Sequence, residues 1–90
     1  MKFRALRIQN SQSFCMAYQQ LPQAIQKKVD RQLAYLAADI THPGLRSKKM
    51  TDMKGIWEAR IDSRYRFTFE LSGGVVRLRT VGTHDIYQRP

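Results

Sequence analysis

The last third of the chain alternates apolar and polar residues in three short runs, which predicts three β-strands. The runs cover residues 56–61, 65–71 and 75–81. Because successive side chains of a strand point to opposite faces, the alternation gathers apolar residues on one face of the predicted sheet. The opposite face collects Glu58, Arg60, Arg66, Thr68, Glu70, Arg77 and Arg79. We therefore expect a sheet with one apolar face and one face rich in arginine.

Short polar segments separate these three strands and predict tight turns. One turn covers residues 62–64, and the next covers 72–74 and contains two glycines. Glycine adopts the positive φ that tight hairpins need, which suits the second of these turns, and we expect a β-hairpin at each. Residues 2–9 also alternate, and they predict a further strand at the start of the chain.

Apolar residues between positions 11 and 40 recur every three or four residues, which predicts two helices. They are Phe14, Ala17, Tyr18 and Leu21 in the first segment, and Ile25, Val29, Leu33, Leu36 and Ile40 in the second. Asn10 or Ser11 offers an N-cap for the first helix. Pro22 separates the segments and suits the first turn of the second helix. Pro43 ends that helix, since it disfavours helical geometry in His42.

The predicted element order is β-α-α-β-β-β, which is typical of an α+β fold. We expect a twisted, mostly antiparallel sheet, with the helical hairpin on its apolar face and an open basic face on the other side. Ninety residues are enough for one core, and no repeat, low-complexity stretch or linker divides them. We interpret residues 1–90 as a single domain.

The chain carries a large positive charge, with 16 Lys and Arg against 7 Asp and Glu, a formal net charge of +9. The excess occurs in both halves of the sequence rather than in a tail. Such a charge attracts polyanions, nucleic acid first, and then acidic proteins. A basic surface that serves only solubility is the alternative.

Hydrophobic runs and cysteine content indicate where in the cell the protein is located. No apolar run approaches the roughly 20 residues that span a bilayer, and the first residues lack the apolar region of a signal peptide. Cys15 is the one cysteine. We expect a cytoplasmic protein without membrane association, disulfides or a cysteine metal cage.

A basic loop is predicted between the second helix and the next strand, over residues 45–54. Its cations are Arg46, Lys48, Lys49 and Lys54. We expect them to hold nucleic-acid phosphates, which position a backbone without reading its sequence, and a merely solvated loop is the alternative. Arg60, Arg77 and Arg79 would extend this basic surface along the strands.

The order and spacing of several motifs resemble the RelE/ParE superfamily. The motifs are Leu21-Pro22, His42-Pro43-Gly44-Leu45, Lys48-Lys49-Met50, Gly55-Ile56-Trp57-Glu58-Ala59-Arg60-Ile61, Tyr65-Arg66-Phe67 and Val81-Gly82-Thr83-His84-Asp85. The resemblance extends over nearly the whole chain and implies the toxin of a bacterial type II toxin–antitoxin module. Resemblance to the RelE-like branch implies a ribosome-dependent endoribonuclease that cleaves messenger RNA, and this is the leading hypothesis. ParE-like toxins inhibit DNA gyrase instead.

Metal-free RNA cleavage requires a base for the 2′-hydroxyl proton, a cation for the charge on the phosphate, and an acid for the leaving 5′-oxygen. His84 stands where the family often places a catalytic histidine or arginine, and imidazole titrates near working pH. Arg66 matches the arginine with which RelE-like toxins stabilise the transition state. The alternatives are a surface histidine, and an arginine that pairs with Glu58 or Glu70.

Two further site residues are implied by the resemblance. Glu58 occupies the strand on which some relatives carry two lysines, and another branch of the family uses a glutamate base. Glu58 is therefore either the general base or a counter-charge for the neighbouring arginines. Tyr87 would stack on a base or assist the acid step.

The resemblance also implies the partners: an acidic antitoxin, the ribosome and messenger RNA, with no metal or small-molecule cofactor. Three alternatives stay open at this point. They are a gyrase inhibitor of the same fold, a non-catalytic basic RNA-binding module, and a relative that has lost its toxicity.

Overall fold

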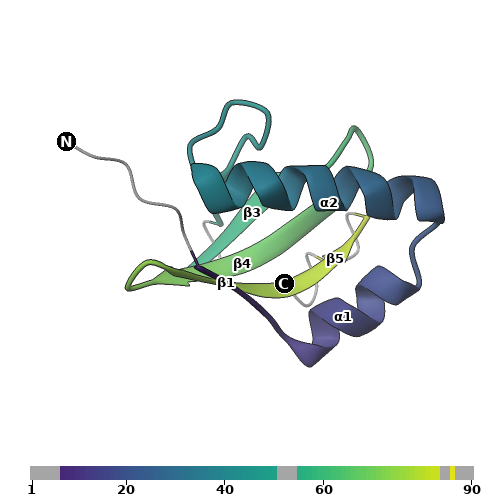
Figure 1. The fold of residues 1–90 in the computed structure, drawn as a ribbon, viewed down its shortest axis with the longest axis horizontal. Helices are drawn as coiled ribbons and strands as arrows, with labels where there is room; N and C mark the ends of the chain where they lie inside the picture. The colour runs from purple at the N-terminus through teal and green to yellow at the C-terminus, as the bar shows by residue number, and fades with distance from the viewer. Residues whose placement is uncertain (1–6, 51–54, 84–85, 87–90) are drawn as a thin grey trace.

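Two helices cover one face of a five-stranded sheet in the computed structural model, which describes residues 7–50, 55–83 and 86 (Figure 1). The elements are β1 (Arg7–Asn10), α1 (Gln12–Gln19), α2 (Gln23–Ala38), β2 (Lys48–Lys49), β3 (Ile56–Arg60), β4 (Arg66–Ser72) and β5 (Val75–Gly82). The predicted α+β class and element order are confirmed. β2 is an addition, since a strand of two residues is too short to show an alternating pattern.

The strand order is β1-β5-β4-β3-β2, so β5, β4 and β3 lie inside the sheet. β1 runs parallel to β5, and the other three pairs are antiparallel. This confirms the mostly antiparallel sheet. The predicted first strand overlaps β1 at residues 7–9, and its residues 2–6 lie outside the described part of the chain.

The helix boundaries follow local chemistry. Ser11 is extended, and its Oγ accepts a hydrogen bond from the Phe14 N–H at 3.0 Å, so Ser11 rather than Asn10 is the N-cap. Pro22 is the N-cap residue of α2 rather than part of its first turn. Ile40 lies beyond the end of α2, because the Asp39 carboxylate accepts hydrogen bonds from the N–H and hydroxyl of Thr41 and favours a turn. None of the helices in the described ranges is long and apolar enough to cross a membrane.

The core lies between the helices and the sheet, and α2 runs across the strands (Figure 1). Phe67 and Phe69 of the inner strand β4 are fully buried, and α2 contributes Val29 and Leu36. Full burial of such a side chain stabilises the fold by roughly 1.5–3 kcal/mol. The apolar face that alternation predicts is therefore the face that the helical hairpin covers.

A bulge in β5 changes which residues reach this core. Strict alternation over residues 75–81 would place Val81 on the same face as Arg77 and Arg79. In the structure Thr68 pairs with Thr80 but Phe69 pairs with Leu78, so β5 has one extra residue, Arg79, at this point. The extra residue shifts the alternation by one. As a result Leu78 and Val81 are both buried, at 0% and 4% exposure.

The polar face carries the predicted basic residues, but some of its side chains are buried. Thr68 is fully buried and Glu58 is 7% exposed. At the end of β5, Gly82 is the register partner of Arg66, so a side chain at position 82 would point to the polar face. Its Cβ would lie 2.8 Å from Cγ2 of Ile86, which is itself buried. Glycine at position 82 therefore allows Ile86 to cover this end of the face.

A buried glutamine of α2 connects this helix to the end of β3. Gln32 is 4% exposed, and its Nε2 donates to the carbonyl oxygens of Gly44 at 3.0 Å and Arg60 at 2.7 Å. The Arg60 N–H in turn donates to the Leu45 carbonyl at 2.7 Å. These bonds fix the end of β3 relative to the segment that follows α2.

Replacing Gln32 by methionine should lower the free energy of unfolding by roughly 1–3 kcal/mol, because a side chain of similar shape leaves two carbonyls without their donor. Urea denaturation measures this loss. The control is Gln23→Met at an exposed position of the same helix, which should change stability by less than about 0.5 kcal/mol. Equal effects of the two substitutions would contradict the anchoring role.

Candidate functional site

A basic cleft opens on the polar face of the sheet, with a volume of about 310 Å³. Its lining residues are Arg46, Lys48, Glu58, Arg60 and Arg66. All five are among the predicted site residues. The cleft thus combines four cationic side chains with one carboxylate, a composition that suits an anion whose reaction also requires a proton acceptor.

The pairing of β2, β3 and β4 brings these side chains together. Lys48 is the register partner of Glu58, and Arg60 is the register partner of Arg66, so the members of each pair share a face. Arg46 comes from the segment before β2 and has φ 48°, in the left-handed region. Non-glycine residues seldom adopt this region, and the conformation presents an arginine to the cleft where glycine would be easier to accommodate.

Glu58 lies at the wall of the cleft and is nearly buried. Its Oε1 lies 3.6 Å from the Nζ of Lys48, whose side chain is 70% exposed. An ion pair with one partner so exposed contributes little to stability. Its consequence is local, since it keeps a carboxylate and an ammonium group next to each other in the cleft.

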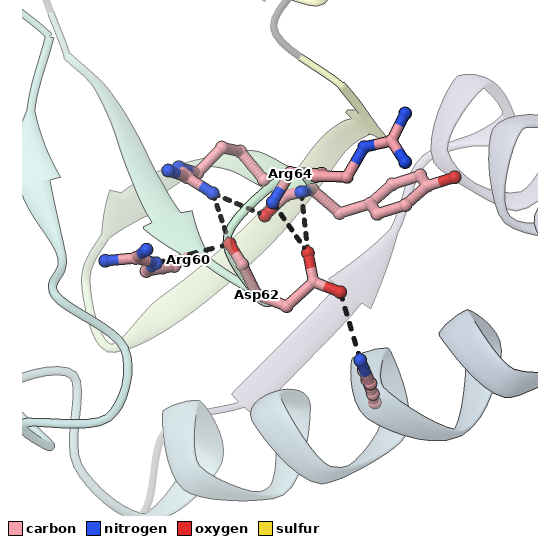
Figure 2. A network of polar contacts seen from close by, with 6 residues as sticks. Arg60, Asp62 and Arg64 are labelled. Carbon is pink, nitrogen blue, oxygen red and sulfur yellow. Dashed lines mark hydrogen bonds and ion pairs between the residues drawn. The ribbon is translucent and has the colours of Figure 1, made fainter.

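Arg60 and Arg66 are register partners next to the turn of the β3–β4 hairpin, so they lie directly opposite each other. Like charges in register repel, so the pair needs an acceptor nearby. The Asp62 carbonyl supplies one, since it accepts from Arg60 Nε at 3.2 Å and also from Arg66 Nη1 (Figure 2). Arg66 Nη1 additionally donates to the Tyr65 carbonyl at 2.9 Å. The turn therefore binds both guanidinium groups through its backbone.

The side chain of Asp62 stabilises the same turn. Oδ1 accepts from the N–H groups of Arg64 and Tyr65, each at 2.9 Å, and Oδ2 accepts from Lys28 Nζ at 3.2 Å (Figure 2). Burial disfavours the charged carboxylate, but the two N–H groups and the Lys28 ammonium outweigh it and hold the pKa of Asp62 below its ordinary value. The sequence indicated a turn at residues 62–64, and the contribution of Asp62 to the site was missed.

Several predicted RNA-binding residues lie away from the cleft. Lys49 is paired with Trp57 on the opposite face, with its Nζ 5.6 Å from the centre of the indole ring. Arg79 forms an ion pair with Glu70, and Arg77 is exposed on β5. Lys48 and Lys49 therefore belong to different faces, and Arg77 and Arg79 lie on β5 outside the cleft.

The sequence left open whether Arg66 pairs with a carboxylate. Within the described ranges, Glu58 forms its ion pair with Lys48 and Glu70 forms one with Arg79. Arg66 donates instead to two backbone carbonyls. A guanidinium has five N–H donors, so these bonds leave donors on its other nitrogens.

Three predicted site residues, His84, Tyr87 and Lys54, lie outside the described residues. The strand before His84 is described: β5 ends at Gly82, the register partner of Arg66.

Comparison with known proteins gives a fold but no sequence relative. No family model matches the chain, and no curated protein matches it. Solved structures do. RelE in the RelE–RelB complex of Pyrococcus horikoshii OT3 has a TM-score of 0.73 at 15% identity, covering 88% of this chain and 94% of that one.

Two further structures show the same similarity. The YoeB dimer from Staphylococcus aureus has a TM-score of 0.73 at 18% identity, covering 89% of this chain and 98% of that chain. The E. coli DinJ–YafQ toxin–antitoxin complex has a TM-score of 0.65 at 18% identity, with coverages of 90% and 94%. The chain thus has the fold of the RelE, YoeB and YafQ toxins.

Asp62 should make stability depend on pH in the acid range. Its folded-state pKa is lowered, so the ionised carboxylate stabilises the fold fully above about pH 4, the ordinary aspartate value, and this contribution is lost as the pH falls through the folded-state pKa. The difference in unfolding free energy between wild type and Asp62→Asn should be about 1 kcal/mol near neutral pH and should shrink on acidification.

Chemical denaturation at a series of pH values measures this difference. Because Lys28 provides part of the shift, the pH-dependent part should be smaller in a Lys28→Met background. A difference that stays constant or grows between pH 5 and pH 2 would show that the Asp62 carboxylate is not stabilised in the folded state.

Proposed function

We propose that this chain is the toxin of a type II toxin–antitoxin module of the RelE/ParE superfamily, and that it acts in the cytoplasm as a ribosome-dependent endoribonuclease on messenger RNA. The observation that supports the proposal is the basic cleft. On a sheet with the fold of RelE, YoeB and YafQ, it brings Arg66, Arg60 and Glu58 together with two further cations. A fold alone would not require two arginines in register beside a buried carboxylate.

The two arginines would stabilise the charge that develops on the scissile phosphate. The planar fork of arginine grips phosphate oxygens in two places and keeps its charge at every physiological pH. Because Arg60 and Arg66 face each other, a phosphate between them would also relieve their mutual repulsion. Their backbone acceptors hold them in place before the substrate binds, so little reorganisation is needed in the transition state.

The proton transfers need one acceptor and one donor. Glu58 would take the proton of the 2′-hydroxyl, so that the 2′-oxygen attacks phosphorus and the bond to the 5′-oxygen breaks. His84 would donate a proton to that leaving oxygen. The products would be a 2′,3′-cyclic phosphate and a free 5′-hydroxyl. Tyr87 would stack on a base next to the cleavage point.

The remaining cations would position the RNA. Arg46 and Lys48 would hold the phosphates on either side of the scissile one, as part of the cleft. Lys49, Lys54, Arg77 and Arg79 would contact the RNA or the ribosome outside the cleft. Such contacts raise affinity without selecting a sequence. The set of acid and base groups is small, and the ribosome would support the reaction by aligning the 2′-hydroxyl with the phosphate.

The antitoxin would be an acidic protein. Two of the structures of this fold are complexes in which the toxin is bound by RelB or by DinJ. A net charge of +9 attracts an acidic, partly disordered partner that folds on binding. Binding over the cleft would neutralise the cations that the substrate needs.

Replacing Arg66 or His84 by alanine should abolish growth arrest on expression and reduce messenger RNA cleavage by roughly 100-fold or more, because each removes a group that acts in the transition state. Primer extension on a reporter transcript after brief expression measures the cleavage. Arg31→Ala, at an exposed position of α2, is the matched control and should cleave like wild type.

Circular dichroism must show that the variants are folded. Full toxicity of both folded variants would overturn the proposed mechanism. A growth arrest that comes with DNA damage and intact transcripts would instead identify a gyrase inhibitor, and binding to ribosomes without any cleavage would identify an RNA-binding module.

A further inference from the structure

One residue outside the cleft contacts both of its opposed arginines. Asp62 does not line the cleft, yet its carbonyl accepts from Arg60 Nε and from Arg66 Nη1. A carbonyl oxygen has two lone pairs, and here each serves a different guanidinium. The direction of this one carbonyl therefore helps to set where both positive charges lie.

The side chain of Asp62 fixes that direction. Its Oδ1 accepts from the N–H groups two and three residues further on, at 2.9 Å each, which is the pattern of an Asx turn. The backbone contributes as well, since the N–H groups of Ile61 and Asp62 donate to the Tyr65 carbonyl at 3.0 and 3.3 Å. With the chain held at these points, the peptide plane after Asp62 has little freedom to rotate.

The negative charge of Asp62 is an alternative explanation for how this residue places the two arginines. The geometry supports it less well than the turn. Oδ2 forms its ion pair with Lys28 at 3.2 Å, but the Lys28 side chain is 44% exposed, so solvent screens the pair. Lys28 belongs to α2 and binds the carboxylate of Asp62, whereas the two arginines bind its carbonyl.

We propose that Asp62 is a positioning residue for the cleft arginines, and that it acts through the turn its Oδ1 holds rather than through its negative charge. The effect of Asp62 on cleavage rests on the proposed nuclease function. The effect of Asp62 on the position of the two arginines does not depend on that function.

Two substitutions separate the turn from the charge. Asp62→Asn keeps an oxygen at the position of Oδ1 but removes the charge. Asp62→Glu keeps the charge for Lys28, but its extra methylene moves the carboxylate away from the N–H groups of Arg64 and Tyr65. Asp30→Asn and Asp30→Glu, at an exposed position of α2, are the matched controls.

The first measurement is independent of activity. In ¹⁵N NMR spectra, the Nε–H signal of Arg60 should stay at its wild-type position in Asp62→Asn. In Asp62→Glu the signal should move to the chemical shift of an arginine whose Nε–H has no protein acceptor. The Arg60 Nε–H proton should then exchange with solvent as fast as it does in such an arginine. The second measurement is cleavage of messenger RNA on ribosomes. Asp62→Asn should cleave within about threefold of wild type, and Asp62→Glu should cleave about 10- to 100-fold more slowly at the same substrate concentration.

The opposite order, with Asp62→Glu like wild type and Asp62→Asn impaired, would overturn the inference in favour of the charge. Wild-type signals and cleavage in both variants would overturn it as well. Asp62→Ala, which also removes Oδ1, replaces Asp62→Glu if that variant does not fold at the assay temperature. If the wild type fails to cleave RNA at all, the proposed function is wrong, and the Arg60 signal still decides the role of Asp62.

Discussion

The cleft depends on holding two like charges opposite each other. Arg60 and Arg66 are register partners on adjacent strands, where their repulsion would normally separate the side chains. The Asp62 carbonyl lies between the strands at their connection and accepts from both guanidinium groups. The site is thus organised by a backbone oxygen, and it has a positive charge density that an anion between the arginines would balance.

The rest of the fold supports this arrangement from a distance. Gln32 binds the carbonyl of Arg60 and fixes the end of β3 from the helix side. The bulge at Arg79 brings Leu78 and Val81 into the core and leaves Gly82 facing Arg66. Ile86 then covers Gly82 at the edge of the polar face. Core packing on one side of the sheet and the cleft on the other side therefore depend on the same strand registers.

Much of the fold could be predicted from the sequence because it follows from local periodicity. The alternation in residues 56–71 predicts β3 and β4 with the correct faces, and the helical spacing with Ser11 as N-cap predicts α1 and α2. Glu58, Arg60 and Arg66 could be placed on one face by the same alternation, and the cleft brings them together.

What could not be predicted depends on pairing between segments. Alternation cannot show a bulge, because the extra residue at Arg79 is defined only by the register with β4. Lys48 and Lys49 look equivalent in a basic run, and only the pairing of β2 with β3 assigns them to opposite faces. The role of Asp62 was missed because a turn residue in a sequence does not show what its carbonyl binds.

The most direct test of the cleft is a titration with a short RNA in which a 2′-deoxy substitution at the cleavage point prevents the reaction, followed by the arginine Nε–H signals. The signals of Arg60 and Arg66 should shift most, and that of the exposed Arg77 should shift much less. Equal small shifts of all arginine signals, or larger shifts at Arg77 than in the cleft, would show that the RNA binds the basic surface in general and that the opposed arginines are not its site.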